Sequence, residues 1–198
     1  LLTHGDPRRL TVRKEEAFPR RWSFPMPTRR ALLAALAALP AGTGSAVAQG
    51  MTRLDAHTFT FEGIDGTPID LAAFRGRAIL VVNTASRCGY TRQYGGLQDL
   101  WTRYGGRGLV VVGVPSNDFG GQELASNEAI SEFCGREFGV TFPMAGKQVV
   151  TGPNAHPLYR WAAREQPGET PRWNFHKYLV GRDGRLLAAF GSPVAPTD

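Results

Sequence analysis

The most informative part of this chain is Ile79-Leu-Val-Val-Asn-Thr-Ala-Ser-Arg-Cys-Gly-Tyr-Thr91. It opens with an apolar run containing two valines, which is typical of a strand buried on both faces of a sheet. Small and polar residues follow this run, and Cys88 comes after them. Beyond the cysteine, apolar side chains recur at helical spacing from Leu97 to Tyr104. Cys88 is therefore predicted to lie where a buried strand passes into a helix.

A cysteine at such a junction is subject to two influences that favour its thiolate form. Unpaired N–H groups and the positive end of the helix dipole gather at a helix N-terminus. Arg87 and Arg92, close to the cysteine on either side, act in the same direction. We therefore predict that Cys88 is a reactive nucleophile.

The flanking sequence predicts the other elements of the fold. The predicted strands are 58–62, 68–71, 78–83, 109–114, 177–180 and 186–190, and the predicted helices follow Cys88 and cover 127–138 and 153–164. The strand–helix–strand order around Cys88 predicts two parallel strands with a right-handed crossover. The last two strands flank Gly181-Arg-Asp-Gly184, which is a hairpin signal. Together these elements predict an α/β fold, a thioredoxin-like three-layer sandwich with a mixed central sheet.

The charge of the chain is concentrated at its N-terminal end. The formal net charge is +6, but residues 1–50 carry +5 of it and the remainder carries only +1. The folded part is therefore close to neutral. Since nucleic-acid binding needs a basic surface on the folded domain, no nucleic-acid partner is expected.

The first 48 residues are expected to precede the folded domain. Residues 1–25 show no hydrophobic periodicity and are interpreted as sequence upstream of a start at Met26. Residues 26–48 contain the parts of a secretory signal, namely a basic start with a twin-arginine pair, an apolar core and a small-x-small cleavage site. The apolar core is too short for a stable membrane span. A fortuitous alanine-rich amphipathic helix is the alternative interpretation.

The location of the protein depends on this signal. If residues 26–48 function as a signal peptide, residues 49–198 form the mature domain and the protein is periplasmic or secreted. If they do not, a cytoplasmic location is expected.

The two cysteines, Cys88 and Cys134, allow two interpretations. They form either a structural disulfide of an exported protein or a redox-active pair. The four histidines are scattered along the chain, and no cysteine–histidine cluster has the spacing of metal ligands. No metal and no cofactor are therefore expected.

Three further places carry polar or reactive groups that a core does not need. Gln122 lies in a loop past the end of a predicted buried strand, at the edge where α/β sheets form their sites. Trp173 and Asn174 precede another strand and supply neutral N–H donors. Cys134 lies on the apolar stripe of the helix after the Gln122 loop. Taken singly, these residues could also be a loop cap, a core aromatic and a buried inert thiol.

Three sequence blocks resemble the signature blocks of the glutathione peroxidase family. They are Asn83-Thr-Ala-Ser-Arg-Cys-Gly-Tyr-Thr91, Asn117-Asp-Phe-Gly-Gly-Gln-Glu123 and Trp173-Asn-Phe-His-Lys-Tyr-Leu179. The resemblance extends from Phe59 to Gly191 and implies a thioredoxin-like fold. It also implies that Cys88 is the peroxidatic cysteine and that Gln122, Trp173 and Asn174 assist it. Cys134 matches the resolving cysteine of the two-cysteine members, which resemble thioredoxin-dependent peroxidases.

The chain departs from the common family pattern in four places. Ser116 stands where a cysteine is frequent, and Asp118 stands where glutamine is common. The segment between His156 and Trp173 lacks the insertion that tetrameric members use for assembly, so a monomer is expected. The sequence ends at Asp198, where family members usually continue into a helix, so part of one sheet face is expected to be uncovered.

The resemblance implies a peroxidase that reduces hydrogen peroxide and organic or lipid hydroperoxides through a cysteine sulfenic acid. A thioredoxin-like protein, or glutathione, is the expected reductant. An exported thiol–disulfide oxidoreductase of the same fold is an alternative, but the sequence Cys88-Gly-Tyr-Thr91 lacks its second cysteine. A metal-binding assembly factor would need paired cysteines and a nearby histidine. A static disulfide between the two cysteines is the remaining alternative.

Overall fold

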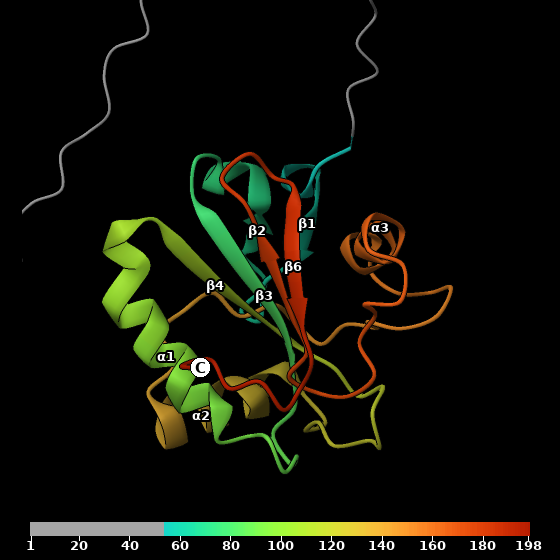
Figure 1. Ribbon diagram of the computed structural model, residues 1–198. Coiled ribbons are helices and arrows are strands. Elements are labelled where there is room, and N and C mark those ends of the chain that lie inside the picture. Colours follow the sequence, from blue (N-terminus) through green and yellow to red (C-terminus); the bar gives the residue numbers. More distant parts are fainter. Residues whose placement is uncertain (1–53) are drawn as a thin grey trace, which may run out of the picture. The chain divides into compact units, whose positions relative to one another are not determined.

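A computed structural model describes residues 54–198 of the protein (Figure 1). The expected upstream segment 1–25 and the expected signal 26–48 lie outside the described residues. The strands are β1 (Thr60–Glu62), β2 (Pro68–Asp70), β3 (Ala78–Thr84), β4 (Leu109–Pro115), β5 (Lys177–Val180) and β6 (Leu186–Phe190). The α-helices are α1 (Gln93–Tyr104), α2 (Asn127–Phe138) and α3 (Pro157–Glu165). Single 3-10 turns occupy Ala56–Thr58, Leu71–Phe74 and Gly105–Arg107.

The central sheet has the strand order β4-β3-β5-β6 and is mixed, as the sequence predicts. β3 and β4 run parallel and are joined through α1, whereas β5 is antiparallel to both β3 and β6. β1 and β2 form a separate antiparallel hairpin. Since β3 and β4 are parallel, their carboxyl ends lie at the same edge of the sheet. The loop containing Cys88 and the loop containing Gln122 both begin at this edge.

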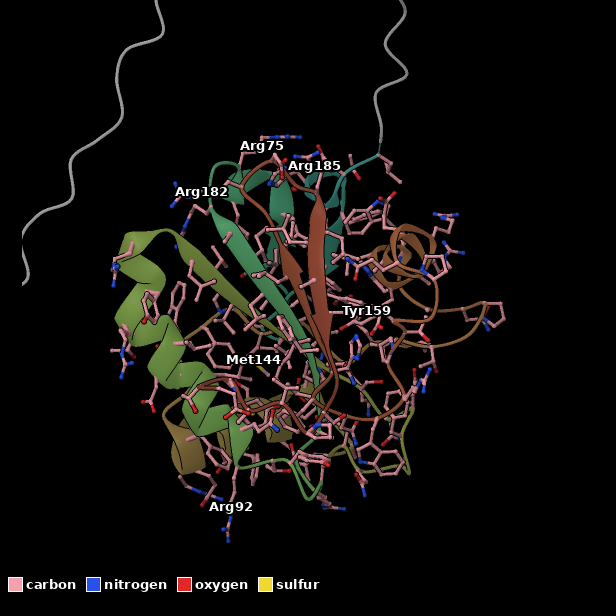
Figure 2. The ribbon with its side chains drawn as sticks, viewed as in Figure 1. Arg75, Arg92, Met144, Tyr159, Arg182 and Arg185 are labelled. Carbon is pink, nitrogen blue, oxygen red and sulfur yellow. The ribbon has the colours of Figure 1, made fainter. Side chains whose placement is uncertain are left out.

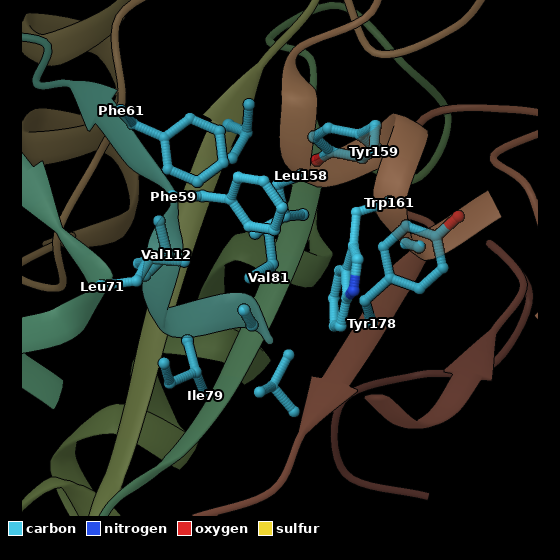
Figure 3. Close-up of a cluster of buried hydrophobic side chains, with 14 of the residues drawn as sticks. Phe59, Phe61, Leu71, Ile79, Val81, Val112, Leu158, Tyr159, Trp161 and Tyr178 are labelled. Atoms are coloured by element: carbon cyan, nitrogen blue, oxygen red, sulfur yellow. The ribbon is translucent and has the colours of Figure 1, made fainter. Parts of the chain in front are cut away.

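The two faces of the sheet are covered by different elements, which gives the three layers. Alternation along β3 sends Ile79 and Val81 to one face and Leu80 and Val82 to the other. The first face packs against the β1–β2 hairpin and α3, where Phe59, Leu158 and Trp161 fill the core (Figure 3). The opposite face packs against α1 and α2. Complete burial of each such aliphatic side chain contributes about 1.5–3 kcal/mol to folding.

Two element boundaries differ from the predicted ones for identifiable reasons. The helix predicted at 153–164 begins only at Pro157, because His156 caps it and proline is well suited to the first helical position. The strand predicted from residue 58 begins at Thr60, because Asp55 accepts the N–H of His57 and caps a 3-10 turn there. Helix α2 begins as predicted, with Ser126 accepting the N–H of Ala129.

In the part of the chain that the structure describes, every helix is too short or too polar to cross a membrane.

Candidate active site

Cys88 lies in the loop that joins β3 to α1, at the carboxyl end of a central strand. Its side chain is partly buried, and its sulfur accepts a 3.4 Å hydrogen bond from the backbone N–H of Tyr90. The Thr91 hydroxyl oxygen accepts the N–H of Cys88 at 2.9 Å and lies 2.9 Å from the carbonyl oxygen of Ala85. Local hydrogen bonds therefore hold the backbone around the sulfur.

Helix α1 follows the cysteine, as the sequence predicts, but not directly. Its first residue is Gln93, so Cys88 precedes the helix and does not lie in its first turn. The N–H group within reach of the sulfur belongs to Tyr90 in the loop. The side chain of Arg92 points outward from the protein (Figure 2). The donor to the sulfur is thus supplied by the loop, and not by the helix terminus.

The structure brings Gln122 and Asn174 together from distant parts of the sequence. The side-chain amide of Asn174 donates to Oε1 of Gln122 at 3.0 Å, and it lies 3.4 Å from the carbonyl oxygen of Phe119. Asn174 is completely buried, while Gln122 is partly exposed. Gln122 is therefore held by its oxygen end.

Trp173 lies beside the same pair. A β-carbon at Gly120 would meet Cγ of Gln122 at 3.5 Å and the indole of Trp173 at 3.7 Å, so these two side chains flank the glycine. The indole also lies against the ring of Phe119, with 6.0 Å between the ring centroids. Trp173 is 40% exposed, which fits a residue lining a solvent-accessible site better than a core aromatic.

Backbone contacts place this group next to the cysteine loop. The N–H of Arg87, the residue before Cys88, donates to the carbonyl oxygen of Gln122 at 2.9 Å. Gly120 and Gly121 both have positive φ angles, of 69° and 63°, which a glycine pair adopts without strain. These glycines turn the loop so that Gln122 returns toward Cys88.

Two further residues of the site region are not predicted from the sequence. Glu123 is buried, and its Oε1 accepts the N–H of Ser86 at 3.1 Å and the N–H of Leu124 at 2.8 Å. Burial raises the pKa of this carboxyl group. Asn83, at the end of β3, donates its side-chain amide to the carbonyl oxygen of Trp173 at 3.1 Å. A buried polar residue inside an otherwise apolar strand is the sequence signal that could have identified Asn83.

Cys134 is separate from this group and is almost completely buried on α2. Burial raises the pKa of its thiol to about 11; the Tyr94 hydroxyl opposes this rise, and the charge of Glu123 adds to it. The two thiols are free in the structure. Cys88 borders the same apolar cluster in which Cys134 is buried, so both cysteines lie on the α1 and α2 side of the sheet.

The described residues contain no group of three histidine, cysteine or acidic side chains that could hold a metal ion. The side chains that the structure brings together at Gln122, Trp173 and Asn174 instead offer neutral amide and indole N–H groups. Such groups stabilise a thiolate or a peroxide oxygen by hydrogen bonding.

Several known proteins resemble this chain in sequence. Residues 56–163 match the profile of the glutathione peroxidase family. The hydroperoxy fatty acid reductase gpx1 of Synechocystis sp. is 44% identical over 149 residues, which cover 71% of this chain and 88% of the relative. The glutathione peroxidase-like peroxiredoxin GPX5 of Chlamydomonas reinhardtii is 43% identical over 136 residues, which cover 67% of this chain and 84% of the relative.

Solved structures agree with the sequence comparisons. The crystal structure of Trgpx in its apo form is 35% identical and has a TM-score of 0.60, with 74% of this chain and 90% of that chain covered. The structure of T. cruzi GPX1 has the same TM-score at 31% identity, with 73% of this chain and 91% of that chain covered. A thiol:disulfide interchange protein of the thioredoxin family from Chlorobium tepidum TLS, at 17% identity and a TM-score of 0.56, shares the fold alone. The chain therefore belongs to the glutathione peroxidase family and has its thioredoxin-like fold.

Proposed function

We propose that this protein is a thiol-dependent peroxidase in which Cys88 reduces hydroperoxides. The observation that carries the proposal is the convergence of Gln122, Trp173 and Asn174 beside the loop of Cys88. Gln122 comes from the loop after β4, whereas Trp173 and Asn174 come from the segment before β5, and a simple disulfide exchanger has no need of them. Family membership supports the same conclusion.

In the first step the thiolate of Cys88 attacks the terminal oxygen of the hydroperoxide. A sulfur–oxygen bond forms while the oxygen–oxygen bond breaks, so sulfur loses two electrons and the peroxide gains them. The leaving oxygen takes a proton and departs as water or an alcohol. The amide of Gln122 and the indole N–H of Trp173 donate to the oxygens on which negative charge develops. Asn174 holds Gln122 in position for this task.

In the second step the thiol of Cys134 attacks the sulfenic acid on Cys88, which forms a disulfide and releases water. A disulfide requires α-carbons within about 7 Å of each other, so α2 must open locally to bring the buried Cys134 to Cys88. A dithiol protein then reduces the disulfide by exchange. We infer a thioredoxin-like reductant, because two relatives are named glutathione peroxidase-like peroxiredoxins.

Hydrogen peroxide and lipid hydroperoxides are the proposed substrates. Two relatives from Synechocystis are named hydroperoxy fatty acid reductases, which supports the lipid class. The partial exposure of Trp173 also leaves one wall of the site open to solvent.

Steady-state peroxidase turnover tests this function. Wild type and Cys134→Ser are assayed with hydrogen peroxide and a fatty acid hydroperoxide, with thioredoxin or glutathione as the electron donor. Turnover with thioredoxin that is lost in Cys134→Ser supports the complete proposal. Turnover with glutathione that survives in Cys134→Ser refutes the resolving role, and the absence of turnover in wild type refutes the peroxidase.

We also propose that residues 26–48 export the protein and that the mature domain is a monomer. The basic, apolar and small-residue order of that segment supports export. Mass spectrometry of the N-terminus after expression in a bacterium tests the first point, since cleavage is expected before Gln49. Light scattering on the mature domain tests the second.

A further inference from the structure

Asn83 holds the segment that carries Trp173 and Asn174. It is the penultimate residue of β3, and its side chain is completely buried. Its side-chain amide donates to the carbonyl oxygen of Trp173 at 3.1 Å, and its own carbonyl oxygen accepts the N–H of Phe175 at 2.6 Å. Its backbone N–H donates to the carbonyl oxygen of His176 at 3.2 Å. One residue thus fixes both sides of Asn174.

The backbone that Asn83 holds has an unusual conformation. Phe175 has a φ angle of 64°, and it is the one non-glycine residue with positive φ in the part of the chain that the structure describes. A bulky residue adopts this region only when the surrounding contacts impose it. The ring of Phe175 is buried edge-on against Tyr94, with 5.4 Å between ring centroids. The three hydrogen bonds of Asn83, with Trp173, Phe175 and His176, act on the residues immediately around this turn.

The chemistry of the asparagine indicates which of its two ends matters. A carbonyl oxygen needs a donor, so the NH₂ end must face Trp173 and the Oδ1 end must face away. Oδ1 is buried and has no hydrogen-bond partner among the described groups. An unpaired buried acceptor is costly, and an apolar residue of the same size would avoid that cost. The asparagine is thus favoured here for its donor and not for its fit to the core.

The contacts of Asn83 also affect the donor group, by which we mean Gln122, Trp173 and Asn174. With Trp173 and Phe175 fixed, the side chain of Asn174 is directed to Gln122, which it contacts at 3.0 Å. The indole of Trp173 is directed to Gly120 and Gln122. If the segment relaxed, both donors would move relative to the loop of Cys88.

We propose that Asn83 is a positioning residue for peroxide reduction, which acts by aligning Trp173 and Asn174 with Gln122. This proposal rests on the proposed peroxidase function. Asn83 lies outside the donor group. Its loss would disable the group without removing any of its members.

The test measures the second-order rate constant for oxidation of Cys88 by hydrogen peroxide, in a Cys134→Ser background so that resolution does not interfere. Asn83→Leu is expected to lower this constant at least tenfold. Asn83→Ser keeps a small polar group that cannot reach Trp173, and it is expected to show a similar loss; it serves as the second variant if Asn83→Leu does not fold. Val81→Ala is the control, because Val81 is buried on the same strand and the same face and loses only packing. This control is expected to react at the wild-type rate despite its lower stability.

A double-mutant cycle separates positioning from general loosening of the fold. In a background that carries both Trp173→Phe and Asn174→Ala, Asn83→Leu is expected to have less than a twofold further effect, because both side chains that it aligns are already absent. A full tenfold loss in that background, or a normal rate in folded Asn83→Ser, overturns the proposal.

Tryptophan fluorescence tests the positioning role of Asn83 separately from the peroxidase function. The emission of Trp173, taken as the difference from a Trp173→Phe variant, is expected to shift to longer wavelength in Asn83→Leu because the indole becomes more solvated. This readout does not depend on peroxide chemistry. If wild-type Cys88 does not react with peroxide, the peroxidase function fails, while an unchanged Trp173 emission in Asn83→Leu overturns the positioning role by itself.

Discussion

Asn174 donates its side-chain N–H to the side-chain oxygen of Gln122 across 3.0 Å. This bond decides which end of the Gln122 amide remains available. Because the oxygen is occupied by Asn174, the NH₂ group is left to donate to the sulfur of Cys88 or to a peroxide oxygen. The pair thus converts a side chain with two possible orientations into a directed donor.

Replacement of that donor should slow the first step. Gln122→Glu keeps the size of the side chain but removes the NH₂ group and adds negative charge beside the developing thiolate and peroxide oxygens. We expect the rate constant for Cys88 oxidation to fall roughly 100-fold, the scale measured for loss of one such donor. Stopped-flow fluorescence with hydrogen peroxide provides the measurement.

Gln98→Glu is the matched control for this prediction. Gln98 lies on α1 and bonds the exposed hydroxyls of Thr102 and Thr141, away from the loop of Cys88. The same substitution there should leave the rate unchanged. If Gln122→Glu slows the reaction less than threefold, Gln122 is not the donor that the geometry indicates.

Cys134 should be unreactive until α2 opens. Burial raises the pKa of its thiol to about 11, so at pH 8 its thiolate fraction is roughly 100-fold below that of an ordinary thiol. In a Cys88→Ser variant, alkylation by iodoacetamide should therefore be at least that much slower in native protein than in urea. Rapid alkylation of the native variant would show that Cys134 is already accessible.

The raised pKa of Cys134 also affects the free energy of unfolding at alkaline pH. The folded state keeps the Cys134 proton up to about pH 11, whereas the unfolded chain releases it near pH 9. Between these values the unfolded state binds fewer protons, so stability falls as pH rises through this window. The full loss approaches about 3 kcal/mol, at 1.36 kcal/mol per pKa unit.

Comparison with Cys134→Ala isolates this contribution from the tyrosines that titrate at higher pH. Urea unfolding of both proteins at pH 8 and pH 10.5 provides the measurement. The wild type should lose more stability than the variant over this interval, and parallel losses would contradict a buried neutral thiol at this position.

The sequence predicts the order of elements well because the apolar runs of β3 and β4 and the stripe on α2 are local signals. It gives no start for α1, because Arg92, at the N-cap position, makes no side-chain capping bond that a sequence signal could mark. It fails to single out Asn83 because the importance of this residue arises from a contact with Trp173, 90 residues later in the chain. The family resemblance is what predicts the roles of Gln122, Trp173 and Asn174, since each residue taken alone is equally compatible with a purely structural role.

Glu123 provides the last prediction, and it was missed for the same reason as Asn83. Its Oε1 accepts the N–H groups of Ser86 and Leu124, which ties the loop of Cys88 to the loop of Gln122. Glu123→Ala leaves these two N–H groups unpaired and should cost about 2–6 kcal/mol of folding free energy, at 1–3 kcal/mol for each group. Glu123→Gln keeps an acceptor oxygen and should fold normally.

The pH dependence of the Glu123 variants distinguishes charge from hydrogen bonding. Burial raises the pKa of Glu123, so the folded state favours the protonated form. The stability that this carboxyl contributes is therefore present at acidic pH and is lost as pH rises from its ordinary pKa toward its raised one. Glu123→Gln, which cannot ionise, should gain stability relative to wild type as pH increases from 4 to 7, as measured by urea unfolding. A constant difference over that range would mean that the folded protein accommodates the charge at Glu123 without cost.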